Sequence, residues 1–180
     1  MKHAILLALL IPLAAHGQSN RGSRGGQGQL TMPAGGASTI PQQIIAPDVP
    51  VLEGLPHAVK VGMTVYVSAM VPLDSTGRLV GAGDLAMQTR QVVANLGSVM
   101  RAARGVPGDV VRATVYIRDL TPEKVAIVRN AILDGLDRAS PPALTIVGVS
   151  AFPEPGIDVT LEATGQLRSE FPDRSRMGKP

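Results

Sequence analysis

Cysteine and tryptophan are absent from the 180-residue chain, and aromatic residues make up only 2% of it. Without cysteine, disulfides, thiolate zinc sites and a cysteine nucleophile are excluded. Histidine is scarce as well, because it occurs only at His3, His16 and His57. A multi-histidine metal site is therefore excluded. His57 is the one histidine available to any catalytic triad in a domain that follows the N-terminus.

The chain also has little excess charge of one sign. Its 17 Lys and Arg residues stand against 14 Asp and Glu, which gives a formal net charge of +3. The excess lies at the two ends, and residues 57–167 carry ten basic and ten acidic residues. A neutral core with so few aromatic residues has no basic patch for phosphate contacts and no stacking platform. We therefore expect no nucleic-acid partner.

The N-terminus has the pattern of an export signal. A short basic start precedes an apolar run over residues 4–15, and small residues follow around Gly17. The run is too short to span a membrane, which takes roughly 20 residues. The pattern predicts a cleavable signal peptide over 1–17, a periplasmic or secreted protein, and no stable membrane anchor after cleavage. A buried N-terminal helix or a retained anchor is the alternative.

The remaining chain divides into three parts. Residues 18–56 are rich in Gly, Gln, Ser and Pro, a composition that predicts a flexible linker. Within it, Ile44, Ile45 and Val51 are apolar enough to add a short ordered stretch against the domain. The pattern predicts one folded domain over 57–167, followed by a basic polar tail over 168–180.

Apolar periodicity predicts the elements of this domain. Asp84 is placed to cap a helix that runs to about Ala103, and Thr121 to cap a second helix with Pro122 at its first position. The predicted strands cover residues 58–61, 64–70, 110–119, 144–150 and 157–165. In the third strand, alternation predicts a buried face of Val111, Ala113, Val115 and Ile117.

The element order β-β-α-β-α-β-β predicts an α+β fold, in which two helices cover one face of a mixed sheet. The other face still needs cover, which predicts oligomerisation.

Six motifs together carry a family resemblance. They are VGMTVYVS at 61–68, VPLDSTGRLV at 71–80, QTRQVVANL at 88–96, GDVVRATVYIRDL at 108–120, PPA at 141–143 and LEA at 161–163. In this order and spacing they resemble the RidA (YjgF-like) family, and the chain is similar to a divergent, exported member of it.

The resemblance implies a chorismate-mutase-like fold and a homotrimer whose sheets pack into a central barrel. It also implies a small-molecule ligand in clefts between neighbouring subunits. The family's activity is hydrolysis of reactive enamines and imines to 2-keto acids and ammonia, without metal or organic cofactor.

The sequence departs from this family at the positions that matter for its chemistry. Family members that deaminate imines carry an arginine directly after Pro-Ala, where this chain has Leu144. They carry a glutamate two residues before the Glu-Ala pair, where this chain has Thr160. Arginine clamps a substrate carboxylate and glutamate orients water, so the resemblance implies an altered substrate.

Other positions of the implied pocket are partly retained. Ser68 matches a family serine, Ala69 stands in place of a glycine, and His57 falls near a pocket tyrosine. The implied ligand pocket is formed by His57, Ser68, Ala69, Met70, Leu144, Ile146 and Thr160. Met70 and Leu144 make it more apolar than usual, which favours a hydrophobic or neutral ligand.

The candidate catalytic residue is Glu162, which a strand places on the same face as Thr160. It could orient the attacking water together with carbonyls near Ile146, and a structural glutamate is the alternative. His57 could serve as acid, base or anion contact, and an exposed loop histidine is its alternative. Two hypotheses follow: an enamine/imine deaminase with altered substrate, or a non-catalytic ligand-binding or structural homotrimer.

Overall fold

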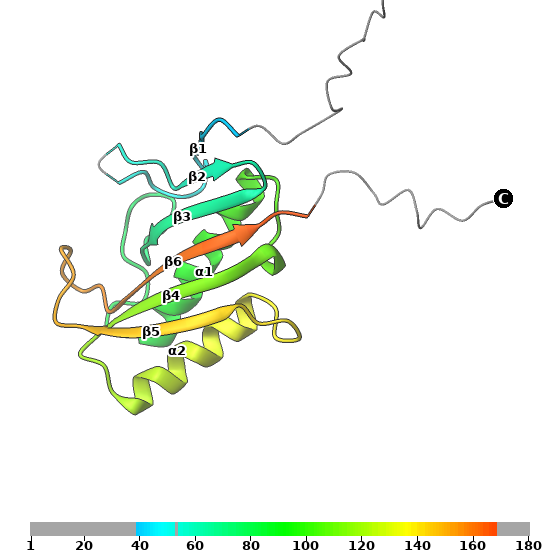
Figure 1. Cartoon of the computed structure of the whole chain (residues 1–180). Coiled ribbons are helices and arrows are strands. Elements are labelled where there is room, and N and C mark those ends of the chain that lie inside the picture. Colours follow the sequence, from blue (N-terminus) through cyan, green and yellow to red (C-terminus); the bar gives the residue numbers. More distant parts are fainter. Residues whose placement is uncertain (1–38, 53, 169–180) are drawn as a thin grey trace, which may run out of the picture. The chain divides into compact units, whose positions relative to one another are not determined.

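A computed structural model of the chain describes residues 39–52 and 54–168. The predicted signal peptide, the first part of the predicted linker and most of the predicted tail lie outside the described residues. The described strands are β1 (Gln42–Ile44), β2 (Ala58–Val61), β3 (Thr64–Met70), β4 (Val110–Arg118), β5 (Ala143–Val149) and β6 (Val159–Gln166). They form one sheet in the order β1-β2-β3-β6-β4-β5 (Figure 1). All neighbours are antiparallel except β4 and β5, which makes the sheet mixed as predicted.

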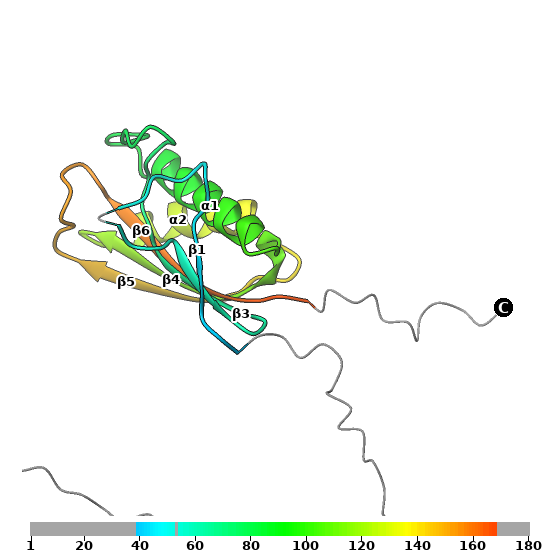
Figure 2. The ribbon, with the colours of Figure 1, turned by 90° about the horizontal axis from the view of Figure 1, so that it is seen from above.

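Two helices, α1 (Leu85–Ala102) and α2 (Pro122–Gly135), lie on the same face of this sheet (Figure 2). Their predicted caps are confirmed. Asp84 Oδ1 accepts a hydrogen bond from the Met87 amide at 2.9 Å, and Thr121 Oγ1 accepts one from the Lys124 amide at 3.4 Å. The α+β class with two helices on one face is therefore confirmed.

The core lies between the helices and the sheet. From α1 it receives Val92, Leu96 and Val99, and from α2 it receives Val128 and Ile132. The sheet contributes Val65, Ala113, Val115, Ile117, Val159 and Leu161, all of which are fully buried. Within the described part of the chain, no element covers the opposite face, where Tyr66 and Val147 are exposed.

One side chain of the predicted β4 pattern lies on the wrong face. Ala113, Val115 and Ile117 are buried as expected, but Val111 is exposed and Val110 is buried in its place. The pairing of β4 with β6 shifts register between Val110 and Arg112. Such a bulge reverses the alternation at one point, which a strict period of two cannot anticipate.

The folded part also begins earlier than residue 57. Strand β1 pairs antiparallel with β2, so that Gln42 lies opposite Lys60 and Ile44 opposite Ala58. Ala46 and Val49, which follow β1, are buried. Residues 42–49 of the predicted linker therefore belong to the folded part, and the ordered stretch expected around Ile44 is present.

Candidate functional site

An apolar cleft opens beside the end of β3, with a volume of about 370 Å³. Three segments line it: the chain before β2, the end of β3, and the loop between β5 and β6 with the start of β6. Its lining residues are Val49, Pro50, Leu52, Leu55, Pro56, His57, Ser68, Ala69, Met70, Val71, Phe152, Pro153, Glu154 and Thr160. The cleft therefore brings together five of the seven predicted pocket residues: His57, Ser68, Ala69, Met70 and Thr160.

His57 fixes the wall of this cleft through its ring. The side chain is buried, its Nδ1 accepts a hydrogen bond from the Ala46 amide at 3.0 Å, and its Nε2 lies 3.1 Å from the Pro50 carbonyl oxygen. Since Nδ1 accepts, the hydrogen is on Nε2 and donates to that carbonyl. Both ring nitrogens thus form hydrogen bonds with backbone groups. The alternative of an exposed loop histidine is wrong, and this geometry leaves no nitrogen free for acid–base work.

Replacing His57 with alanine is expected to lower the free energy of unfolding by about 2 kcal/mol, because a buried amide and a carbonyl lose their partner. Chemical denaturation measures the loss, and hydrogen exchange should show reduced protection of the Ala46 amide. Ser68→Ala is the control, since that exposed hydroxyl makes only one hydrogen bond, to the Pro56 carbonyl. Equal stability of the two variants would contradict the role given to His57.

A bulge in β3 presents two consecutive side chains to the cleft. The pairing of β3 with β6 shifts register between Val67 and Met70, and Ser68 and Ala69 between them are both exposed. Ser68 Oγ donates to the Pro56 carbonyl at 3.0 Å, which leaves its lone pairs able to accept a hydrogen bond from a ligand. Met70 is buried and also lines the cleft.

Thr160 and Glu162 share a face of β6, as predicted, but they line different hollows. Thr160 is buried and lines the cleft. Glu162 lies instead in a second hollow of about 240 Å³, with Tyr66, Arg112 and Thr114.

The Glu162 carboxylate is engaged there. The Tyr116 hydroxyl donates to Glu162 Oε1 at 3.1 Å, and this hydrogen bond is the main reason why the pKa of Tyr116 is raised. Glu162 therefore has a structural partner, and within one chain it does not line the cleft.

Leu144 and Ile146 also lie away from the cleft of their own chain. They pair in register with the buried Ala113 and Val115, so they share the face that the helices cover, and they pack against the core while remaining half-buried. Their strand, β5, is the edge of the sheet. A single chain therefore does not bring Leu144 and Ile146 together with the five predicted pocket residues that line the cleft.

The sequence reasoning missed the loop that closes the cleft. Phe152, Pro153 and Glu154 line it, and among the described lining residues Glu154 is the one that is Asp, Glu, Lys or Arg. Gln88 anchors the end of this loop: its Nε2 donates to the Gly156 carbonyl at 2.8 Å, and its Oε1 accepts from the Asp158 amide at 2.8 Å. The proline-rich run before the last strand was the available signal.

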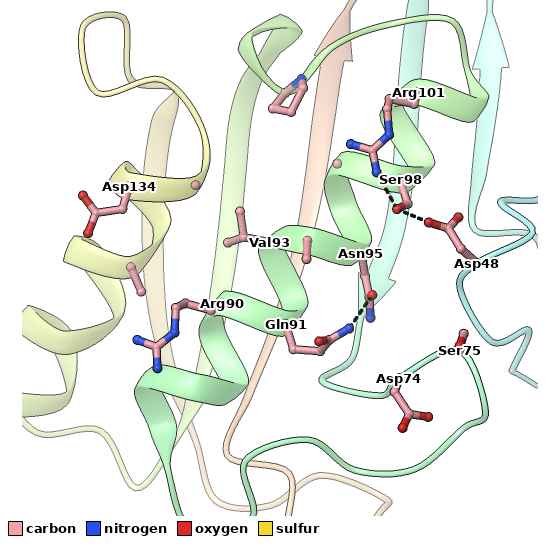
Figure 3. Close-up of a pocket in the computed structure, with 15 residues that line it drawn as sticks. Asp48, Asp74, Ser75, Arg90, Gln91, Val93, Asn95, Ser98, Arg101 and Asp134 are labelled. Carbon is pink, nitrogen blue, oxygen red and sulfur yellow. Dashed lines mark hydrogen bonds between the residues drawn. The ribbon is translucent and has the colours of Figure 1, made fainter.

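A larger groove of about 650 Å³ lies over α1 and α2 (Figure 3). Arg101 donates to Ser98 at 2.8 Å and Ser98 donates to Asp48 at 2.5 Å. Asp74 and Asp134, which also line it, form ion pairs with arginines four residues further along the chain. Several polar groups of this groove are already engaged, either with one another or with arginines outside its lining, whereas the apolar cleft holds five of the predicted pocket residues. The apolar cleft is therefore the better candidate for a ligand.

The described residues contain no cluster of three or more His, Cys, Asp or Glu side chains that could hold a metal ion. None of the helices found in residues 39–52 and 54–168 is long and apolar enough to cross a membrane.

Comparison with known proteins identifies the class. A family model described as Endoribonuclease L-PSP matches residues 48–166. A RutC family protein of Sulfurisphaera tokodaii is 34% identical over 98 residues, which cover 54% of this chain and 76% of that protein. The 2-iminobutanoate/2-iminopropanoate deaminase of Mus musculus is 35% identical over 108 residues, covering 59% of this chain and 76% of that protein.

A solved structure of a related protein has a similar fold. RidA from an Antarctic Psychrobacter bacterium is 31% identical, with a TM-score of 0.63 over 70% of this chain and 99% of that one. The molecule is thus an α+β protein of the L-PSP type. The chain belongs to the RidA (YjgF) family, as its motifs predicted.

Proposed function

We propose that this protein hydrolyses reactive imines or enamines in the apolar cleft. In the reaction, water adds to the carbon of the C=N bond and that bond breaks, giving a carbonyl compound and ammonia. An enamine is first protonated at carbon to become the imine. The observation that carries the proposal is that Ser68 and Thr160 line one cleft in a chain whose relatives include named imine deaminases.

The proposed substrate differs from that of the named relatives. Leu144 stands where the resemblance implies a carboxylate-binding arginine, and Thr160 stands where it implies a water-orienting glutamate. Loss of a charged clamp removes about 1.5–3 kcal/mol of binding, or roughly ten- to a hundredfold in affinity. We therefore propose that 2-imino acids are poor substrates.

We further propose that the working unit is a homotrimer with the ligand between subunits. The open sheet face, where Tyr66 is 54% exposed, supports an assembly that covers it. The edge position of β5 would let Leu144 and Ile146 of one subunit complete the cleft of the next. Export, by the N-terminal signal predicted above, is part of the same proposal.

The test is the decay of imines generated in place by an oxidase, with purified protein of verified mass in solution. We expect faster decay of an imine that lacks a carboxylate, and little acceleration of 2-iminopropanoate. Thr160→Val and Glu162→Gln then test which of the two side chains holds the attacking water. The variant that removes the hydrogen-bond partner of the water should have a kcat/KM about tenfold lower. A trimer that accelerates no imine would contradict the proposal.

A second candidate function is a non-catalytic binding protein. The observation that favours it is the hydrogen bond from Tyr116 to Glu162, which engages the candidate catalytic carboxylate outside the cleft. It predicts reversible ligand binding that responds to substitution of Leu144, without release of ammonia. The matched family model is described as an endoribonuclease, but within one chain none of the described residues that line the cleft is a Lys or Arg that could hold phosphate.

A further inference from the structure

The charges around the cleft point to one class of ligand. Within one chain, none of the described residues that line it is Lys or Arg, and Glu154 contributes a carboxylate. His57 offers no free donor to an anion, because both of its ring nitrogens already form hydrogen bonds, with the Ala46 amide and the Pro50 carbonyl. A ligand anion would thus enter an apolar cleft without a partner, and burying an unpaired charge is strongly unfavourable.

The polar atoms of the cleft favour a hydrogen-bond donor. Ser68 uses its own hydrogen for the Pro56 carbonyl, so that its oxygen is left as an acceptor. The Glu154 carboxylate only accepts when ionised. Phe152 adds an aromatic ring, whose negative face attracts cations. A cleft that offers hydrogen-bond acceptors and an aromatic ring among apolar side chains is complementary to an organic cation.

We propose that the cleft binds small organic cations with an apolar body, and that its substrates are protonated imines derived from amines without a carboxylate. The substrate part rests on the proposed function, whereas the binding part does not. An iminium group carries N–H donors and a positive charge, so it complements Ser68 and Glu154. The alkyl part would lie against Val49, Leu52 and Met70.

Binding is tested with three probes of similar size: butylammonium, 1-butanol and butanoate. Each is titrated into the purified full chain, and amide shifts are followed by NMR. We expect butylammonium to bind at least about tenfold more tightly than butanoate, with 1-butanol between them, and the largest shifts at residues 68–70 and 152–154. Butanoate binding as tightly as butylammonium, or no binding of butylammonium at tens of millimolar, would overturn the proposal.

Glu154→Gln keeps the shape and removes the charge. It should weaken butylammonium binding about three- to fivefold and leave 1-butanol unchanged, since an exposed carboxylate contributes up to about 1 kcal/mol. Glu123→Gln, at the start of α2 and outside the cleft lining, is the matched control and should change neither affinity. An equal loss of butylammonium affinity in both variants would show that the net charge of the protein attracts the ligand, and it would contradict the role of Glu154.

The experiments distinguish failure of the proposed hydrolysis from failure of the proposed preference for organic cations. If butylammonium binds as expected but no imine decays faster, the proposed hydrolysis is wrong and the cation preference stands. If imines are hydrolysed but 2-iminopropanoate is used as well as a carboxylate-free imine, hydrolysis stands and the proposed substrate class is wrong.

Discussion

Replacing Gln88 with methionine is expected to lower the free energy of unfolding by about 3–4 kcal/mol, because several buried polar groups lose their partner together. Gln88 is fully buried on α1. Its Nε2 donates to the carbonyls of Gly81 and Gly156 at 3.1 and 2.8 Å, and its Oε1 accepts from the Asp158 amide at 2.8 Å. Methionine fills a similar volume but makes none of these bonds.

The same substitution should loosen the wall of the cleft. Gln88 holds Gly156 and Asp158 at the end of the loop that carries Phe152 and Glu154, so the Asp158 amide, which loses its acceptor, should exchange faster in the variant. Urea denaturation measures the stability, and hydrogen exchange measures the loop.

Gln91→Met is the matched control for this prediction. Gln91 lies one turn further along α1, is only half-buried, and donates to Asn95 Oδ1 and to the Leu73 carbonyl, which also accepts from Asn95. Its loss leaves one acceptor without a partner and should therefore cost about 1–2 kcal/mol, less than the loss at Gln88. Equal losses at Gln88 and Gln91 would show that the loop is not held by Gln88.

The elements of the fold could be predicted from the sequence because their signals are local. Asp84 and Thr121 mark helix starts, and the apolar face of β4 follows from alternation except at its bulge. Strand β1 could not be predicted in this way, since Gln42 and Gln43 show no apolar alternation. Its position depends on backbone pairing with β2 and on the His57 amide, which donates to the Ile44 carbonyl at 3.0 Å.

The site could be predicted only in part, for a different reason. Ser68 and Thr160 were found because family motifs fix their positions in adjacent strands. The role of His57 was hidden, because its partners are backbone groups of Ala46 and Pro50 in a segment with no strong pattern. Glu154 was missed because a loop residue shows no periodicity, and its importance depends on which charges are absent around it.

Combining Leu144→Arg with Thr160→Glu is expected to raise the rate of 2-iminopropanoate hydrolysis by about ten- to a hundredfold over the unaltered protein. The arginine would supply the missing clamp for the substrate carboxylate, and the glutamate would orient the water. Thr160 already lines the cleft, so a longer side chain at that position reaches the ligand. Leu144 would contribute from the edge strand of the neighbouring subunit.

Two single variants separate the parts of this effect. Thr160→Glu alone adds a second carboxylate to a cleft without a cation, so it should not speed the decay of a 2-imino acid. Leu144→Met, which keeps the volume without charge, should leave the rate unchanged. If the double variant is a folded trimer and remains inactive while carboxylate-free imines are hydrolysed, then Leu144 does not reach the neighbouring cleft. The altered substrate would then depend on the acceptors around Ser68 and Glu154 rather than on the two replaced residues.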